Sequence, residues 1–154
     1  MNLTYVVGAA GWATAAIACG DARIEMPVSY LQDSLRDLLS AANAISSGAR
    51  EITVVFMDEP GEHHLHVRRI DDERIILSAI WFSDWTSRDE GGSAGTRVLS
   101  CESTVAHFRG QVLAAARAIL DEHGLEGYRE LWREYEFPLE QYEQLRKTRK
   151  RNQA

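Results

Sequence analysis

The chain has 154 residues, a length typical of one domain with its own hydrophobic core. Its 45% hydrophobic and 26% charged residues exclude the disordered, collagen-like and membrane-spanning classes. The formal charge is −6, but five of the 17 basic residues lie in Arg146–Arg151, so residues 1–145 carry twelve basic and 23 acidic side chains, a balance of −11. Because an acidic body repels nucleic acid and anionic lipid, the composition predicts a basic protein partner, with no nucleic acid and no membrane.

The amino-terminal stretch is apolar, but no Lys or Arg precedes Arg23, so the positive segment of an export signal is missing. No stretch approaches the roughly 20 apolar residues of a membrane-spanning helix. Cys19 and Cys101 are too few for a disulfide framework, and we interpret them as buried thiols, with a single bridge as the alternative. These features together predict a cytoplasmic protein.

The first third of the chain predicts a hairpin followed by a helix. Gly20 and Asp21 form a turn signal, and beyond them apolar residues alternate with charged ones up to Val28. Residues 29–48 then place their leucines on one helical stripe, with Gly48 as a typical stop.

The rest of the chain predicts strands and then helices. Strand patterns cover 51–59, 63–70, 74–82 and 96–103, with a surface loop over 83–95. Helical spacing begins at Ser103 or Thr104, stops at Gly124, resumes over 125–137 and restarts after Pro138. The sequence therefore predicts a single α+β domain over 1–154. We expect an antiparallel sheet of about five to six strands with helices on one side, in the order ββα-ββββ-ααα, and a basic, frayed tail over 146–154.

Three of the five histidines lie together in the stretch EHHLHVRR. If Leu65 points inward, strand alternation places His64 and His66 on the opposite face and His63 beside the apolar residues. Two such imidazoles can hold a borderline metal, but a complete site needs further donors, and the adjacent arginines oppose a cation. We favour a solvated hairpin face with no metal and no cofactor, and keep a metal or ligand site at His64 and His66 as the alternative.

No motif typical of an enzyme is present, so the sequence favours a protein without catalytic residues. The most distinctive surface is aromatic and acidic, because acidic residues occur at two predicted turns and one of these, the loop after residue 82, also contains a tryptophan. We predict a protein-binding surface at these turns, composed of Asp58, Glu59, Glu62, Asp84, Trp85, Asp89 and Glu90.

Four stretches, among them VFMDEPGEHHLHV, IWFSDW and ILDEHGLEGYRELWREYEFPL, together resemble a family of small uncharacterised bacterial proteins of the actinobacterial type. That resemblance implies no catalytic residues. The chain is also similar in type, without a shared motif, to the immunity proteins that neutralise bacterial toxins. We therefore expect a non-catalytic binding protein that masks a basic, toxin-like partner, and the sequence leaves homo-oligomerisation open.

Overall fold

The computed structural model describes residues 1–85 and 94–148, and these form seven strands and three helices. In chain order the elements are β1 (Asn2–Val7), β2 (Trp12–Cys19), β3 (Ala22–Ser29), α1 (Ser34–Ser46), β4 (Glu51–Met57), β5 (Glu62–Arg69), β6 (Arg74–Phe82), β7 (Thr96–Thr104), α2 (Val105–Trp132) and α3 (Leu139–Thr148).

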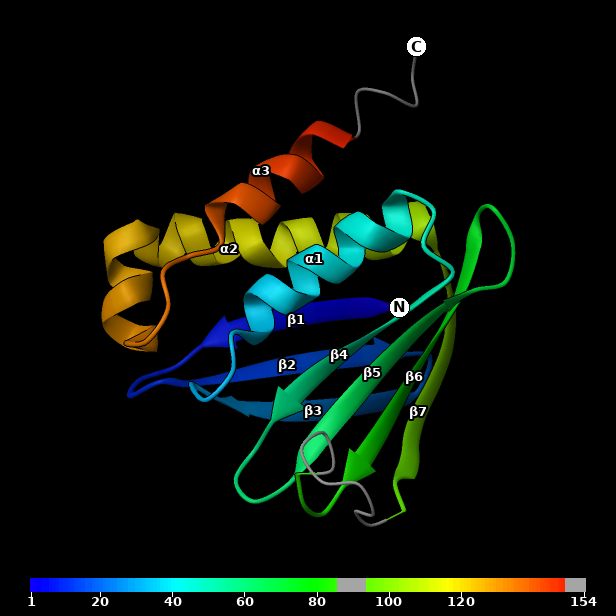
Figure 1. Ribbon diagram of the computed structural model, residues 1–154, viewed down its shortest axis with the longest axis horizontal. Helices are drawn as coiled ribbons and strands as arrows, with labels where there is room; N and C mark the ends of the chain where they lie inside the picture. Colours follow the sequence, from blue (N-terminus) through cyan, green and yellow to red (C-terminus); the bar gives the residue numbers. More distant parts are fainter. Residues whose placement is uncertain (86–93, 149–154) are drawn as a thin grey trace.

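The strands form two antiparallel sheets, β1-β2-β3 and β4-β5-β6-β7, whose strands run in clearly different directions (Figure 1). In both sheets every neighbouring pair is consecutive in the chain, so no crossover is needed. Alternation gives each strand a buried face, as in β1, where Leu3, Tyr5 and Val7 are buried.

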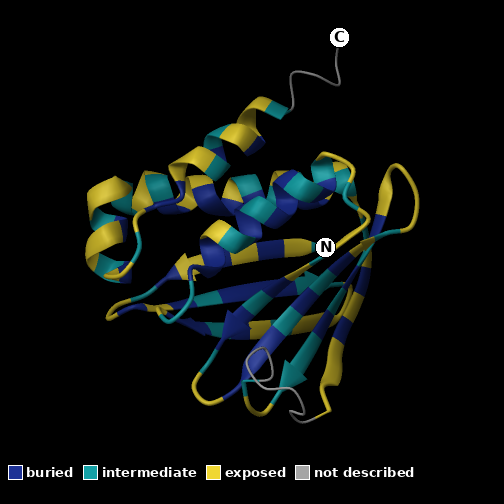
Figure 2. Cartoon of the chain, viewed as in Figure 1, coloured by how far each residue is buried: buried dark blue, intermediate teal, exposed yellow. Residues whose placement is uncertain are grey.

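The helices lie together on one side of the molecule, where α1 packs against β4, α2 against β1, and α3 against α1 (Figure 1). Buried side chains of both sheets and all three helices belong to one hydrophobic core, which includes Ile17, Leu38, Leu77, Phe108 and Leu145. In Figure 2 the buried residues lie on the sides of the helices and strands that face each other. None of the described helices combines the length and the apolar character needed to cross a membrane.

Local sequence determines where the helices begin and bend. The carboxylate of Asp33 accepts a hydrogen bond from the N–H of Arg36 and caps α1, and the hydroxyl of Thr104 accepts from the N–H of His107 and caps α2. Gly124 adopts φ 66° and ψ −176°, so α2 kinks where the sequence predicts a stop. Arg146 and Lys147 lie in the last turn of α3, where they complement its dipole.

The sheets are joined by a disulfide between Cys19 in β2 and Cys101 in β7, whose Cα atoms lie 6.1 Å apart. The interpretation of these residues as free thiols is therefore wrong. The two positions are 82 residues apart in sequence, and only the packing of one sheet on the other brings them within the reach of a disulfide.

The predicted α+β class, the antiparallel pairing and the four strands between residues 51 and 103 are confirmed. Three details differ. The strands form two sheets, the described order is βββα-ββββ-αα, and β1 is a strand that the sequence interpretation missed. Residues 146–148 of the expected frayed tail belong to α3, and 149–154 lie outside the described residues.

Candidate functional site at the turn between β4 and β5

The turn between β4 and β5 is fixed by its own backbone. The N–H of Asp58 donates to the carbonyl of Gly61 at 2.8 Å, and the carboxylate of Asp58 accepts from the N–H of Glu59 at 2.7 Å. A Cβ at Gly61 would clash with the ring of Trp81 and the carbonyl of Phe82, so a glycine is required there. The turn is therefore held against the end of β6.

Trp85 joins the segment after β6 to this turn. Its indole Nε1–H donates to the carbonyl oxygen of Asp58 at 2.9 Å, and the side chain is half-buried. Two turns that the sequence analysis singled out separately are thus in direct contact. Asp84, one residue before Trp85, is exposed, as is Glu59. This end of the four-stranded sheet, comprising Asp58, Glu59, Asp84 and Trp85, is called the acidic end below.

Glu62 opens β5 and is fully buried. Its Oε1 lies 2.7 Å from Nε2 of His64, whose ring centroid is 4.5 Å from that of Phe82. Such a hydrogen bond satisfies a carboxylate that would be costly to bury alone. The exposure expected for Glu62 is therefore wrong, and the residue supports the surface from beneath.

The histidines divide between the two faces of β5 as alternation predicts. His63 is buried with its ring centroid 4.6 Å from that of Trp81, whereas His64 and His66 lie on the other face, 6.0 Å apart. Burial lowers the pKa of His63, with nearby Asp58 opposing the shift. Burial also lowers the pKa of His66, and the neighbouring His64 adds to this effect.

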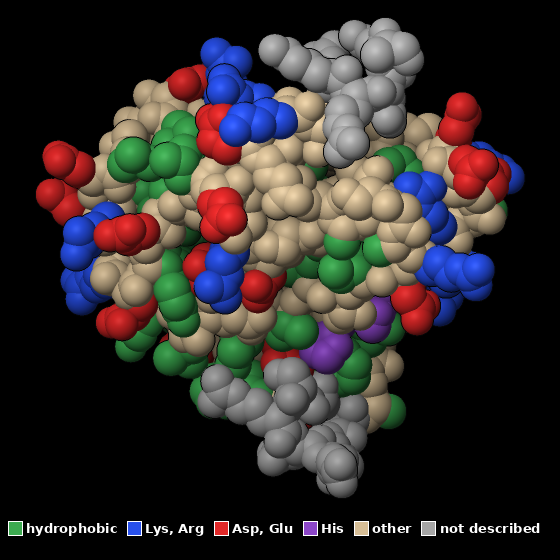
Figure 3. Space-filling view, turned by 45° about the horizontal axis from the view of Figure 1, so that its top comes forward, with side chains coloured by type: hydrophobic (Ala, Val, Ile, Leu, Met, Phe, Trp, Pro, Cys, Tyr) green, Lys and Arg blue, Asp and Glu red, His purple; other side chains and the backbone are tan. Residues whose placement is uncertain are grey.

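Both imidazoles of the alternative metal site already make polar contacts within the protein. His64 contacts Glu62, and Nδ1 of His66 lies 2.7 Å from the hydroxyl of Thr53. Within residues 1–85 and 94–148, no three His, Cys, Asp or Glu side chains gather in a way that could hold a metal ion. Histidine side chains reach the surface in Figure 3, and both His64 and His66 are half-buried, with His64 against the ring of Phe82, so this face is not fully solvated.

The acidic end differs electrostatically from the helical side of the molecule. Over the helices, acidic and basic side chains are interspersed (Figure 3), and pairs form at 3.5 Å between Arg117 and Asp121 and at 2.8 Å between Arg146 and Glu143. By contrast, Asp58 and Glu59 have no ion-pair partner among the described residues. The negative charge of this turn is thus not offset by an ion pair among the described residues, although acids without an ion pair, such as Glu126, also lie on the helices.

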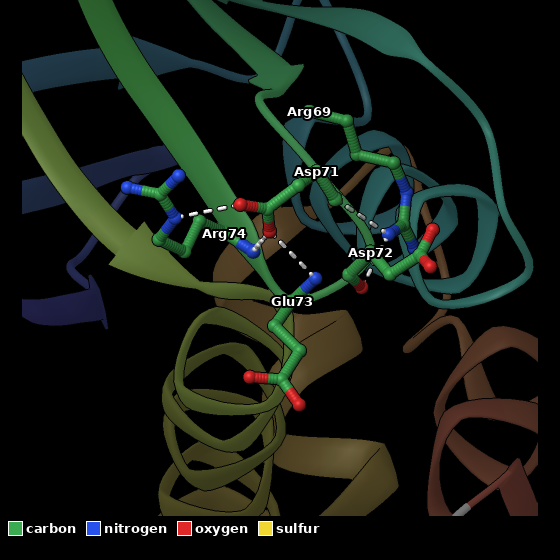
Figure 4. Close-up of polar contacts among 5 residues, drawn as sticks. All are labelled: Arg69, Asp71, Asp72, Glu73 and Arg74. Carbon is green, nitrogen blue, oxygen red and sulfur yellow. Dashed lines mark hydrogen bonds and ion pairs between the residues drawn. The ribbon is translucent and has the colours of Figure 1, made fainter.

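A separate groove of about 970 Å³ lies where the ends of α1 and α3 meet the start of α2 and the turn between β5 and β6. Arg69 lines it, but its guanidinium donates to the carbonyl of Asp72 at 2.7 Å (Figure 4) and to that of Ile45 at 2.6 Å. The cation of Arg69 is therefore used to connect the turn to the end of α1.

The turn at this groove is organised by Asp71. Its carboxylate accepts hydrogen bonds from the backbone and side chain of Arg74 and from the backbone N–H of Glu73 (Figure 4). These bonds, those of Arg74 first, lower the pKa of Asp71 to about 2. The charges around the groove thus have structural roles, which makes it a weaker candidate than the acidic end.

Of the predicted binding residues, the structure brings Asp58, Glu59, Asp84 and Trp85 together and buries Glu62. Asp89 and Glu90 lie outside the described residues. The sequence interpretation missed the pairing of Glu62 with His64, although their spacing of two places both side chains on one face of a strand. No protein-family model, no curated protein and no solved structure matches the chain.

Proposed function

We propose that the chain is a non-catalytic protein-binding protein and that the acidic end is its contact surface. The observation that carries the proposal is the hydrogen bond from Trp85 Nε1 to the Asp58 carbonyl, which joins two acidic turns around one aromatic side chain. Tryptophan is enriched among the residues that dominate binding energy, and it has a polar group for orientation and a large apolar area for burial.

The partner we propose is a protein with a basic surface. Residues 1–145 carry a balance of −11, and half-buried Asp58 and exposed Glu59 have no ion-pair partners among the described residues. Charge of this kind accelerates association with an oppositely charged protein, whereas the buried aromatic anchor determines dissociation. A toxin-neutralising immunity protein, the type to which the sequence is similar, is the example of this class that we propose.

The compartment is part of the proposal. We propose a cytoplasmic location, where reductants keep cysteines as thiols, whereas the Cys19–Cys101 disulfide is typical of oxidising compartments. We keep the cytoplasmic location, with the consequence that this pair would be reduced in the cell. The protein would then depend on its hydrophobic core alone.

The experiment compares two charge reversals of equal size. Glu59→Arg changes the acidic end, and Glu126→Arg changes an exposed acid on α2 without an ion-pair partner among the described residues. Partners captured from native cells by the wild-type protein should be retained by Glu126→Arg. We expect Glu59→Arg to lower their association rate about tenfold at low salt, because field-steered association varies over this range or more.

The binding rates are measured with purified partner at several salt concentrations, after circular dichroism has shown that both variants are folded. Equal association rates for the two variants would remove the acidic end from the proposal. Failure of the wild-type protein to capture any partner in a salt-sensitive manner would contradict protein binding itself.

A further inference from the structure

β7 is an edge strand of the four-stranded sheet, and much of it is open to solvent. It pairs with β6 on one side, and no described strand pairs with its other side. Leu99 and Cys101 are buried on the inner face, whereas the remaining residues are mostly exposed, namely Thr96, Arg97, Val98, Ser100, Glu102 and Thr104. Figure 2 shows exposed residues along β7.

The other strands at sheet edges are protected in ways that β7 is not. β4 lies along α1 and β1 along α2, where the N–H of Leu3 donates to Oε1 of Gln111 at 2.9 Å. β3 contains Pro27, which has no N–H to offer a further strand. β7 has neither a proline nor a covering helix along its length, and an unprotected edge of this kind is a template for strand addition.

The charges of β7 are complementary to those of a second β7. Arg97 stands opposite Ile80 of β6 and Glu102 opposite Ile76, so neither finds an opposite charge across the ladder in its own sheet. No ion pair joins either side chain to another described residue. Glu102 does interact electrostatically with Arg74, but the guanidinium of Arg74 is paired with Asp71. Two copies in antiparallel orientation would bring each arginine towards the glutamate of the other copy.

We propose that β7 pairs antiparallel with β7 of a second copy of this chain, across a two-fold axis at Ser100. With Ser100 opposite Ser100, Leu99 stands opposite Cys101, so the buried faces of both sheets continue into each other. Val98 is an additional residue between Arg97 and Leu99 in the pairing with β6. Glu102 therefore meets the Arg97–Val98 bulge, which presents Arg97 on the same outer face as Glu102.

This register satisfies the rule that directly opposite residues share a face. It also produces two Arg97–Glu102 pairs by symmetry, because a two-fold interface repeats every contact. The inference does not rest on the proposed function, since the acidic end lies at the turn between β4 and β5.

The first test is a charge exchange measured by analytical ultracentrifugation across the micromolar range. The wild-type protein should form dimers. Arg97→Glu alone and Glu102→Arg alone should each raise the dissociation constant about tenfold or more, because each creates two like-charged cross-strand contacts. The double exchange Arg97→Glu, Glu102→Arg should return the constant to within about threefold of wild type, since the pairs are restored with reversed sign.

The second test is a crosslink at the symmetry axis. Opposite residues in an antiparallel pair have Cα atoms about 4.5–5.5 Å apart, within the reach of a disulfide. Ser100→Cys should therefore give a covalent dimer on mild oxidation, whereas Ser78→Cys, its neighbour on the outer face of β6, should not. A monomeric wild-type protein at every concentration, or a double exchange no better than the single ones, would overturn the proposal. Binding of a foreign strand to β7 without self-association would overturn it equally.

Discussion

His63 is the buried imidazole of the acidic end, and burial decides its protonation state. Its exposed fraction is 8%, and Nδ1 has no hydrogen-bond partner among the described residues. Burial removes the ring from water and so disfavours its protonated form, which is why the pKa is lowered, with Asp58 only partly opposing the effect. The folded protein therefore binds fewer protons at this site than the unfolded chain.

That difference makes stability depend on pH in a definite direction. The folded pKa of His63 lies below the ordinary value of 6.5, so its contribution to stability is present above about pH 6.5 and is lost as pH falls through the folded pKa. His63→Phe keeps a ring against Trp81 but cannot be protonated. We predict that the unfolding free energy of this variant falls less between pH 7 and pH 5 than that of the wild-type protein.

Urea unfolding at a series of pH values measures this slope. The slope should be reduced and not abolished, because the pKa of His66 is also lowered and His66 remains in the variant. At pH 8, well above the lowered pKa of His63, the comparison gives the effect of packing alone. Identical pH slopes for the two proteins would contradict the role given to His63.

At the residue scale, strand alternation was sufficient to predict which face of a strand each side chain occupies. The pattern at Leu65 and Val67 assigns His64 and His66 to one face and His63 to the other, as the structure has them. Alternation does not say how far a face is covered. Glu62 is buried because Phe82 stands opposite it and Met57 lies beside it in the ladder, neighbours that belong to other strands.

At the scale of elements, the turn between β5 and β6 does more than connect two strands, because it is also bonded to the end of α1. Arg69 in this region donates to the carbonyl of Ile45 in the last turn of α1, a helix with no basic residue of its own there. The same guanidinium donates to the carbonyls of Asp71 at 3.3 Å and Asp72 at 2.7 Å. One side chain therefore donates to a carbonyl at a helix end and closes a turn at the same time.

We predict that Arg69→Lys lowers the unfolding free energy by about 1–3 kcal/mol, because an ammonium group cannot reproduce the fork that reaches three carbonyls. The matched control is Arg68→Lys, since Arg68 is the exposed neighbour on the outer face of β5. A conservative surface change of that kind should stay within about 0.5 kcal/mol. Chemical unfolding of both variants gives the comparison, and equal small effects would show that the Arg69 contacts contribute little.

Sequence patterns recovered most elements, and the exceptions have physical causes. The strands between residues 51 and 103 have turn signals on both sides and were predicted as such. β1 has clear alternation at Leu3, Tyr5 and Val7, but the apolar stretch that begins within it was considered only as an export signal, which was rejected, and the strand pattern was overlooked. The helical path resumes beyond Gly124 because Tyr128 and Trp132 continue the buried stripe of α2.

At the scale of the whole molecule, what sequence patterns could not supply is how distant elements face each other. Whether the strands form one sheet or two is decided by how β1-β2-β3 and β4-β5-β6-β7 pack with the helices in one core, and only α1 lies between the two sets of strands in the chain. The Cys19–Cys101 disulfide could not be predicted for the same reason, because each cysteine lies in an ordinary strand pattern that does not indicate its partner. Only the relative placement of the sheets makes them partners.

The disulfide therefore links the two sheets covalently, and its effect is on the molecule as a whole. It closes a loop with a sequence separation of 82 residues, which restricts the unfolded chain. Such a link contributes about 2–4 kcal/mol in most small proteins. For a domain of this size we predict that reduction lowers the midpoint of thermal unfolding by roughly 5–15 °C.

Thermal unfolding followed by circular dichroism, with and without reductant, measures this difference. The double variant Cys19→Ser, Cys101→Ser is the control, because it should unfold near the midpoint of the reduced wild-type protein whether or not reductant is present. The reduced protein should still unfold cooperatively, since the core is shared by both sheets and all three helices. A wild-type midpoint that does not change on reduction, with both thiols shown to be free by labelling, would mean that the packing of the sheets alone holds them together.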